Sequence, residues 1–183
     1  MSDYSCLSIL KSKAKELSSV KGIKRTEALE IVAKEAQFPS YHELSEVAKR
    51  DPMDSRLVFA ALGETSLKEV IFHEGVFSAL EREVEEQLSG DIAETNANGF
   101  TMEDPEATKV SYNQDKGILS VTVTFEYQGD QDPDRAYSGT SFSVEAEMEL
   151  LFRSYEWSLV DDSLTFLSVK SDVDRNWYDD SDL

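Results

Sequence analysis

Apolar and polar residues alternate most clearly between Gly117 and Phe152. Two runs of alternate apolar positions make up this stretch: Leu119, Val121, Val123, Phe125 and Tyr127, then Phe142, Val144, Ala146, Met148 and Leu150. Because successive side chains of a strand point to opposite faces, the pattern predicts two strands joined by a loop over residues 128 to 139. If they pair, one face of the sheet is apolar. Hydroxyl groups and four glutamates line the other face: Glu126, Glu145, Glu147 and Glu149.

Helical spacing dominates the first fifty residues. A first amphipathic helix is predicted from apolar residues at three- and four-residue steps: Leu7, Leu10, Ala14 and Leu17. Gly22 ends this helix, and a second is expected to begin near Lys24. A third begins at Ser40, which has the spacing of a capping box with Glu43, and stops before Pro52.

The middle of the chain predicts two more helices. Asp54 can cap a short one that Gly63 ends, and a longer one is expected from Ser66, kinked or divided at Gly75. Its apolar stripe is Phe77, Leu80, Val84, Leu88 and Ile92. Residues 96 to 105 are interpreted as a loop.

Further strands flank the central pair. Val110 and Tyr112 predict one before a hairpin turn at residues 113 to 117, and residues 157 to 169 predict another, interrupted at Asp161. The expected fold class is therefore α+β: a three-helix module, then helices packed on one face of a roughly four-stranded antiparallel meander. The expected domains are a helical module over 1–50, an acidic α+β domain over 51–170 and an acidic aromatic tail over 171–183.

The first fifty residues also carry a family resemblance. The segments concerned are Leu10-Lys-Ser-Lys-Ala-Lys-Glu-Leu17, Gly22-Ile23, Glu27-Ala28-Leu29, Ala33 and Phe38-Pro-Ser-Tyr-His-Glu-Leu44. They resemble a short three-helix module at the N-termini of many bacterial, plasmid and phage proteins, some of them related to the glyoxalase superfamily. The resemblance implies a helical module without catalytic residues of its own. No metal-binding pattern of a glyoxalase follows it in the chain.

Charge is distributed unevenly, and this points to the kind of partner. The net charge is −19, yet residues 1–50 hold nine Lys or Arg against seven Asp or Glu, whereas residues 51–183 hold nine against 30. Such a field repels nucleic acid and anionic membranes from the larger part and favours a basic protein partner. The candidate partner-binding residues are Glu145, Glu147, Glu149, Asp130, Asp132, Asp134, Trp177 and Tyr178.

A nucleic-acid-contacting regulator is the alternative hypothesis, because the second and third helices resemble a helix-turn-helix. The side chains that would contact phosphates are Lys11, Lys13, Lys15, Lys21, Lys24 and Arg25. Gln37 stands where glycine is usual in the turn. The reading helix would expose Glu43 and Glu46 rather than residues that recognise base edges.

Catalytic and metal-binding chemistry is poorly represented. His42 and His73 lack ligand-type neighbours, and no phosphate-binding glycine motif occurs. Asp130, Asp132 and Asp134 have the spacing of the first ligands of an EF-hand calcium loop. However, Arg135 stands where that loop requires glycine, and Ser141 stands where it requires glutamate. We therefore expect no cofactor, no metal and no enzyme. A small-molecule pocket between helix and sheet is a third alternative.

The expected setting is the cytoplasm. No apolar run approaches the roughly 20 residues that a bilayer crossing requires, and the N-terminus does not read as a signal peptide. The single cysteine, Cys6, fits a reducing compartment and is interpreted as a small apolar residue near a helix start.

Overall fold

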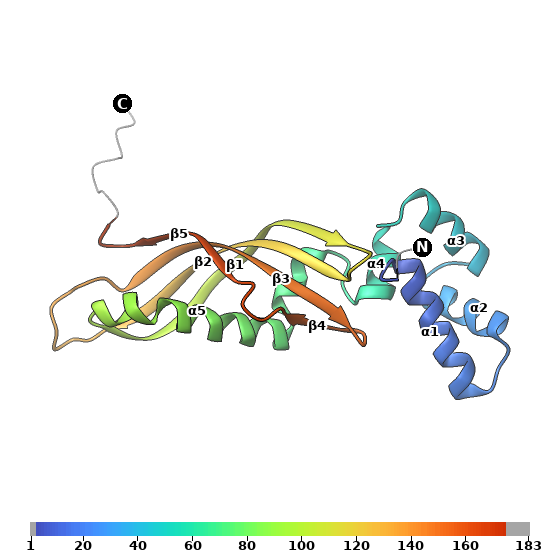
Figure 1. Cartoon of the computed structure of the whole chain (residues 1–183), viewed down its shortest axis with the longest axis horizontal. Helices are drawn as coiled ribbons and strands as arrows, with labels where there is room; N and C mark the ends of the chain where they lie inside the picture. The colour runs from blue at the N-terminus through green and yellow to red at the C-terminus, as the bar shows by residue number, and fades with distance from the viewer. Residues whose placement is uncertain (1–2, 175–183) are drawn as a thin grey trace, which may run out of the picture. The chain divides into compact units, whose positions relative to one another are not determined.

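The computed structural model describes residues 3–174 and packs them into two units (Figure 1). We call them the helical unit, which comprises Met1–Val70, Ser111–Leu119 and Leu151–Trp157, and the sheet unit, which comprises Ile71–Val110, Ser120–Leu150 and Ser158–Leu183. Trp177 and Tyr178 lie outside the described residues. The expected boundary at residue 50 stays a prediction.

Four helices make up most of the helical unit: α1 (Cys6–Lys21), α2 (Arg25–Glu35), α3 (Tyr41–Arg50) and α4 (Ser55–Leu62). Three begin with a side-chain cap, in which Ser5, Ser40 or Asp54 accepts a hydrogen bond from a backbone N–H of the first turn. Two end at a left-handed glycine, Gly22 after α1 and Gly63 after α4, as the sequence predicts.

The core of the helical unit differs slightly from the expected one. On α1 the buried residues are Cys6, Ile9, Leu10 and Ala14. The half-buried Leu7 and Leu17 therefore lie at the margins of a face that is rotated from the predicted one. Burial raises the pKa of the Cys6 thiol to about 11, which fits a structural role for this cysteine.

Trp157 ties a strand end into the helical unit. Its ring lies 4.9 Å from Phe152 and 6.0 Å from Tyr112 between centroids. Its Nε1–H donates to the backbone oxygen of Leu62 at 3.0 Å, at the end of α4. The bond satisfies a buried indole that would otherwise lose its water partner.

Five strands form one antiparallel sheet: β1 (Ala97–Asn113), β2 (Ile118–Gln131), β3 (Ser141–Arg153), β4 (Glu156–Leu159) and β5 (Thr165–Ser171). The order is β1-β2-β3-β4, and β5 also pairs with β3. The α+β class, the helical N-terminus and the antiparallel meander are confirmed. The strand expected over 157–169, with an interruption at Asp161, consists of the two strands β4 and β5, and the break between them includes Asp161 and Asp162.

The alternation along β2 and β3 is confirmed at its apolar positions, whereas Thr122, expected on the solvent-facing side, is buried at 7% exposure. The inner face is buried, from Leu119 at 0% exposure to Leu150 at 0%. Helix α5 (Glu74–Glu94) runs along this face, and its buried residues are Val76, Leu80, Val84 and Leu88 (Figure 1). Each large apolar side chain buried there contributes roughly 1.5 to 3 kcal/mol, so this layer dominates the stability of the sheet unit.

Two predictions in the middle of the chain are wrong in detail. The expected loop at 96–105 is instead the first part of β1, in which Asp104 adopts a left-handed φ of 49°. The long helix is a 3₁₀ helix, η1 (Leu67–Phe72), followed by α5, and the division falls at His73, whose extended backbone caps α5. The buried stripe consequently starts at Val76 rather than at Phe77.

Within residues 3–174, none of the helices is both long enough and apolar enough to cross a bilayer.

Candidate binding groove on the outer face of the sheet

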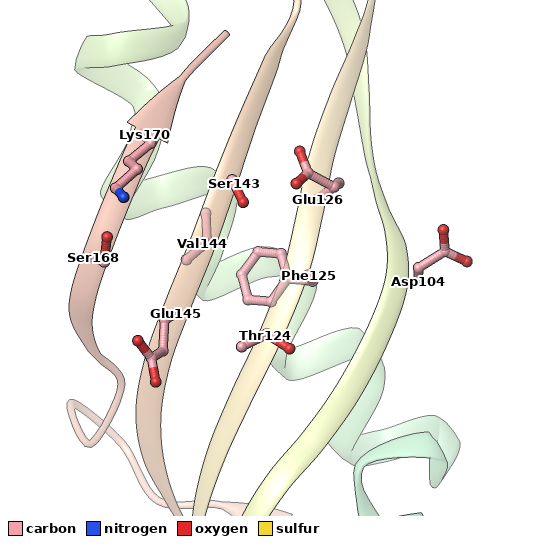
Figure 2. A pocket seen from close by; sticks show the side chains of 9 residues that line it. All are labelled: Asp104, Thr124, Phe125, Glu126, Ser143, Val144, Glu145, Ser168 and Lys170. Atoms are coloured by element: carbon pink, nitrogen blue, oxygen red, sulfur yellow. The ribbon is translucent and has the colours of Figure 1, made fainter. Parts of the chain in front are cut away.

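A groove of about 440 Å³ lies on the outer face of the sheet, opposite α5 (Figure 2). It is lined by Asp104 from β1, Thr124, Phe125 and Glu126 from β2, Ser143, Val144 and Glu145 from β3, and Ser168 and Lys170 from β5. Its polar side chains comprise three carboxylates, three hydroxyls and one ammonium. Hydrogen-bond acceptors and negative charge therefore predominate.

The register between β3 and β5 sets the floor of the groove. Glu145 lies directly across from Ser168, and Ser143 lies across from Lys170. A long side chain thus faces a short one in each pair. Glu145 is half-buried beside the small hydroxyl, so its carboxylate is positioned by the strands but remains open to solvent.

Asp104 marks the β1 side of the groove and stands on unusual backbone. Its left-handed φ of 49° interrupts the alternation, so the buried residues on either side, Met102 and Ala107, are five positions apart. A left-handed residue within a strand redirects the side chains that follow it, and aspartate tolerates this conformation better than most residues. The carboxylate of Asp104 is exposed as a result.

Only one of the three predicted β3 glutamates lines the groove. Glu147 and Glu149 are exposed on the same face, farther along the strand. Glu147 lies across from Thr165, where β5 begins. Glu149 pairs with the connection to β5, since its backbone N–H donates to Ser163 Oγ at 3.1 Å. Together with Glu145 they form an acidic row, which we call the β3 row.

The three predicted loop aspartates are separate from the groove. Asp130 is the penultimate residue of β2. Asp132 and Asp134 follow in the loop, where the Asp134 N–H donates to Asp132 Oδ1 at 2.9 Å. The loop is tied to the start of β1 by the Asp132 N–H, which donates to the Asn96 backbone oxygen at 3.1 Å. No cluster of three ligand-type side chains that could hold a metal ion occurs among residues 3–174.

A different aspartate, Asp172, holds the loop in place. Its carboxylate accepts from the Tyr137 hydroxyl and from the backbone N–H of Thr140, at 3.1 Å to Oδ2. Burial raises the pKa of Asp172, but these hydrogen bonds together outweigh burial and hold the pKa below its ordinary value. Asp172 is therefore a structural carboxylate.

The predicted nucleic-acid residues divide into two groups. Lys13 is half-buried, its Nζ donates to the Ala60 backbone oxygen, and it lies 5.2 Å from the Tyr155 ring centroid. Burial lowers its pKa, and it is engaged within the helical unit. Lys11 is half-buried as well. The exposed members of the set are Lys15, Lys21, Lys24 and Arg25.

Sequence reasoning missed Asp104, Ser168 and Lys170. Each comes from a strand whose position beside β2 or β3 depends on pairing between distant parts of the chain. The signal that was available is the alternation around Ser168 and Lys170 within the predicted fourth strand. It does not tell which earlier strand would lie next to them.

Comparisons with protein-family models, with curated proteins and with solved structures find no match to this chain. The resemblance of residues 1–50 to a phage and plasmid module accordingly stays a prediction.

Proposed function

We propose that this is a non-catalytic interaction protein whose sheet unit binds a basic protein partner on its outer face, as acidic inhibitors, antitoxins, immunity proteins and adaptors do. The observation that carries the proposal is the coincidence of charge and packing. The sheet unit contains 24 Asp or Glu and five Lys or Arg, whereas the helical unit contains 13 of each. The whole net charge of −19 thus belongs to one packing unit.

The groove is a site where the negative charge of the sheet unit can contact a partner. The carboxylates of Glu126 and Glu145 lie beside a hollow lined by hydroxyls, a setting that suits the ammonium of lysine or the guanidinium of arginine. Asp104 adds a third carboxylate at the β1 side, where it points away from the other strands (Figure 2). One such contact at a solvated surface is worth about 1 kcal/mol or less. Recognition therefore has to use several contacts at once, which the β3 row and the groove provide together.

The test is a binding comparison between two charge variants of the full chain. Glu145, Glu147 and Glu149 are changed to Gln in the first, and Glu83, Glu85 and Glu86 of α5 are changed to Gln in the second. Both lose the same charge from the same unit. Partners captured from host lysate and identified by mass spectrometry are expected to be lost from the first variant and retained by the second. Equal capture by both variants would overturn the proposal.

A second candidate, contact with nucleic acid through α2 and α3, is favoured by one observation. Gln37, between these helices, adopts φ of 63°, the left-handed conformation that a helix-turn-helix usually reserves for glycine. The absence of glycine from this position therefore does not prevent the turn. Exposed Glu43 and Glu46 still face outward on α3.

A gel shift with the full chain tests this candidate. Retardation of duplex DNA or RNA at low salt is expected if it holds, and changing Lys21, Lys24 and Arg25 to Gln should reduce the retardation. If the protein retards no nucleic acid at about 50 mM salt, contact with nucleic acid through α2 and α3 is excluded.

A further inference from the structure

The sheet has an edge that is open to another strand. Strand β5 pairs with β3 on one side, and the strand order places no described strand on its other side. Its central residues stay exposed: Leu167 at 49% and Val169 at 37%. An unpaired edge with exposed apolar side chains is a template for strand addition.

The opposite edge, β1, is protected. Asp104 bends the strand by its left-handed backbone, and Pro105 follows with no N–H to offer. Bulges and prolines are the usual devices that block pairing at an edge. Strand β5 has a register shift of its own, where Glu145 and Ala146 pair with Ser168 and Phe166, but residues 168–171 beyond it pair regularly with β3. These residues contain no proline, so this stretch of β5 is the edge suited to accept a strand.

The backbone direction at β5 follows from its pairing. The Asp172 N–H donates to the Ser141 oxygen at 3.0 Å, across the ladder to β3. In an antiparallel ladder, residues two apart turn their N–H and C=O groups to the same side. The backbone N–H and C=O groups of Ser168 and Lys170 therefore point toward β3. Val169, between them, presents its N–H and C=O to the open edge.

Charge selects the occupant. A second copy of the chain would bring another unit with 24 acidic and five basic residues against this one, which repulsion disfavours. An extended segment with lysine or arginine has the complementary sign. The apolar side chains of Leu167 and Val169 favour apolar residues at some of its positions.

We propose that the open edge of β5 receives an extended basic segment of the partner, which adds as a further strand beside β5. This inference rests on the proposed function and names the form in which the partner binds. The added strand lies about 10 Å from β3, since neighbouring strands are about 4.8 Å apart. A lysine or arginine across from Ser168 reaches over the small hydroxyl to Glu145. The residue across from Lys170 is neutral or acidic. The recognised segment therefore alternates apolar and polar residues and has a lysine or arginine across from Ser168.

The probe is a labelled peptide of about twelve residues in which Val takes every second position and Lys and Thr take turns between them, so that Lys can lie across from Ser168 and Thr across from Lys170. A peptide of the same composition with all lysines grouped is its control. Binding by fluorescence anisotropy is expected to favour the alternating peptide by about tenfold, because only it can place apolar and basic side chains on opposite faces. Hydrogen exchange of the unmodified protein is expected to show the Val169 amide slowed by the peptide. An unchanged Val169 amide would overturn the inference.

Two comparisons separate the backbone hydrogen bonds of the added strand from its charge contacts. The first compares Val169→Pro with the unmodified protein, and the second compares Glu145→Gln with Glu149→Gln. Val169→Pro removes the outward N–H without removing a bond to β3, and is expected to weaken the alternating peptide about tenfold while circular dichroism stays that of the unmodified protein. Glu145→Gln is expected to weaken it about threefold, and Glu149→Gln, which lies beyond the end of β5, by less than that.

Failure of the inference can be told from failure of the proposed function. If the alternating and grouped peptides bind equally, and Val169→Pro changes neither, the partner binds the acidic face without adding a strand and the edge inference is wrong. If no basic ligand binds at all, the proposed function is wrong as well. Concentration-dependent self-association that Val169→Pro abolishes would show that the edge pairs with a second copy, and this too contradicts the inference.

Discussion

The two packing units handle charge in opposite ways. In the helical unit, cations lie on aromatic rings: the Arg153 guanidinium is 4.3 Å from the Tyr4 ring centroid, and that of Arg56 is 4.1 Å from that of Phe38. Arg56 also forms an ion pair with Asp54 at 3.1 Å. In the sheet unit, the β3 row stays exposed or half-exposed above an apolar layer. Charge is part of the packing in one unit and part of the surface in the other.

The excess negative charge of the sheet unit is not used in packing and is therefore available to other molecules. Exposed carboxylates contribute little to folding and repel one another, so a unit with 24 acidic and five basic residues carries a cost that its fold does not require. The helical unit shows that the same chain can balance its charges. The imbalance of the sheet unit is then a property of its surface, available to a partner.

The largest expected effect tests how tightly the helical unit is packed. Gly117 has φ of 65°, and an added Cβ would lie 2.7 Å from Tyr4 Cγ and from Arg153 Nη1. Gly117→Ala is expected to lower the free energy of unfolding by about 2 to 3 kcal/mol, from backbone strain and from the displaced ring. Chemical denaturation followed by circular dichroism measures the loss.

Gly22→Ala is the matched control. Gly22 has a similar φ of 63° but nothing within 4 Å of the added Cβ, so its substitution costs only the conformational term, about 1 kcal/mol. Equal losses in the two variants would show that the packing of Tyr4 and Arg153 against Gly117 contributes nothing.

The next effect concerns the exception in the sheet unit, the engaged carboxylate of Asp172. Because its folded pKa is lowered, its ionised form stabilises the fold above the unfolded pKa, near 4, and this contribution is lost as pH falls through the folded value. Asp172→Asn is expected to cost about 1 kcal/mol at pH 7, reduced by partial exposure to water. The difference between the two proteins should shrink below about pH 4 in urea denaturation.

Asp134→Asn serves as its control, because Asp134 is an exposed aspartate of the loop that Asp172 contacts. A pH dependence of stability that is identical in the two variants would contradict an internal role for Asp172.

The smallest effect is the response to salt. At about 0.1 M ionic strength charges more than roughly 10 Å apart are already screened, so added salt relieves what repulsion remains among the sheet unit's carboxylates. Raising sodium chloride from about 0.05 to 0.5 M is expected to stabilise the sheet unit by about 0.5 kcal/mol and the helical unit by less. Hydrogen exchange of amides in α5 and in α1 provides the two readings. A larger gain in α1 would break the comparison.

Much of the fold was predictable because local rules decide it. The caps at Ser40 and Asp54, the glycine stops and the alternation along β2 and β3 need only neighbouring residues. The loop expected at 96–105 was wrong for a physical reason. Gly99, Asp104 and Pro105 are turn-forming residues, but here all three lie within a long edge strand, whose backbone is kept extended by pairing with β2.

The candidate groove was predictable only in part. Glu145 stands on a strand whose two faces the sequence defines, so its exposure follows from alternation. Its neighbours Ser168 and Lys170 follow from the register of β5 on β3, which depends on the bulge between Glu145 and Ala146. A one-residue shift in that register would turn each β5 side chain to the other face. Local sequence does not fix such a shift.

Because Cys6 is buried, the rate at which its thiol is alkylated measures how often the helical unit opens. Its thiol is 3% exposed, and a pKa of about 11 keeps it protonated at neutral pH, so alkylating reagents reach it only when α1 separates from its neighbours. The rate of its modification therefore reports that separation directly. A second cysteine introduced at an exposed position of the sheet unit, such as Glu147, would react much faster than Cys6, so a dye attached there could follow partner binding in the same sample.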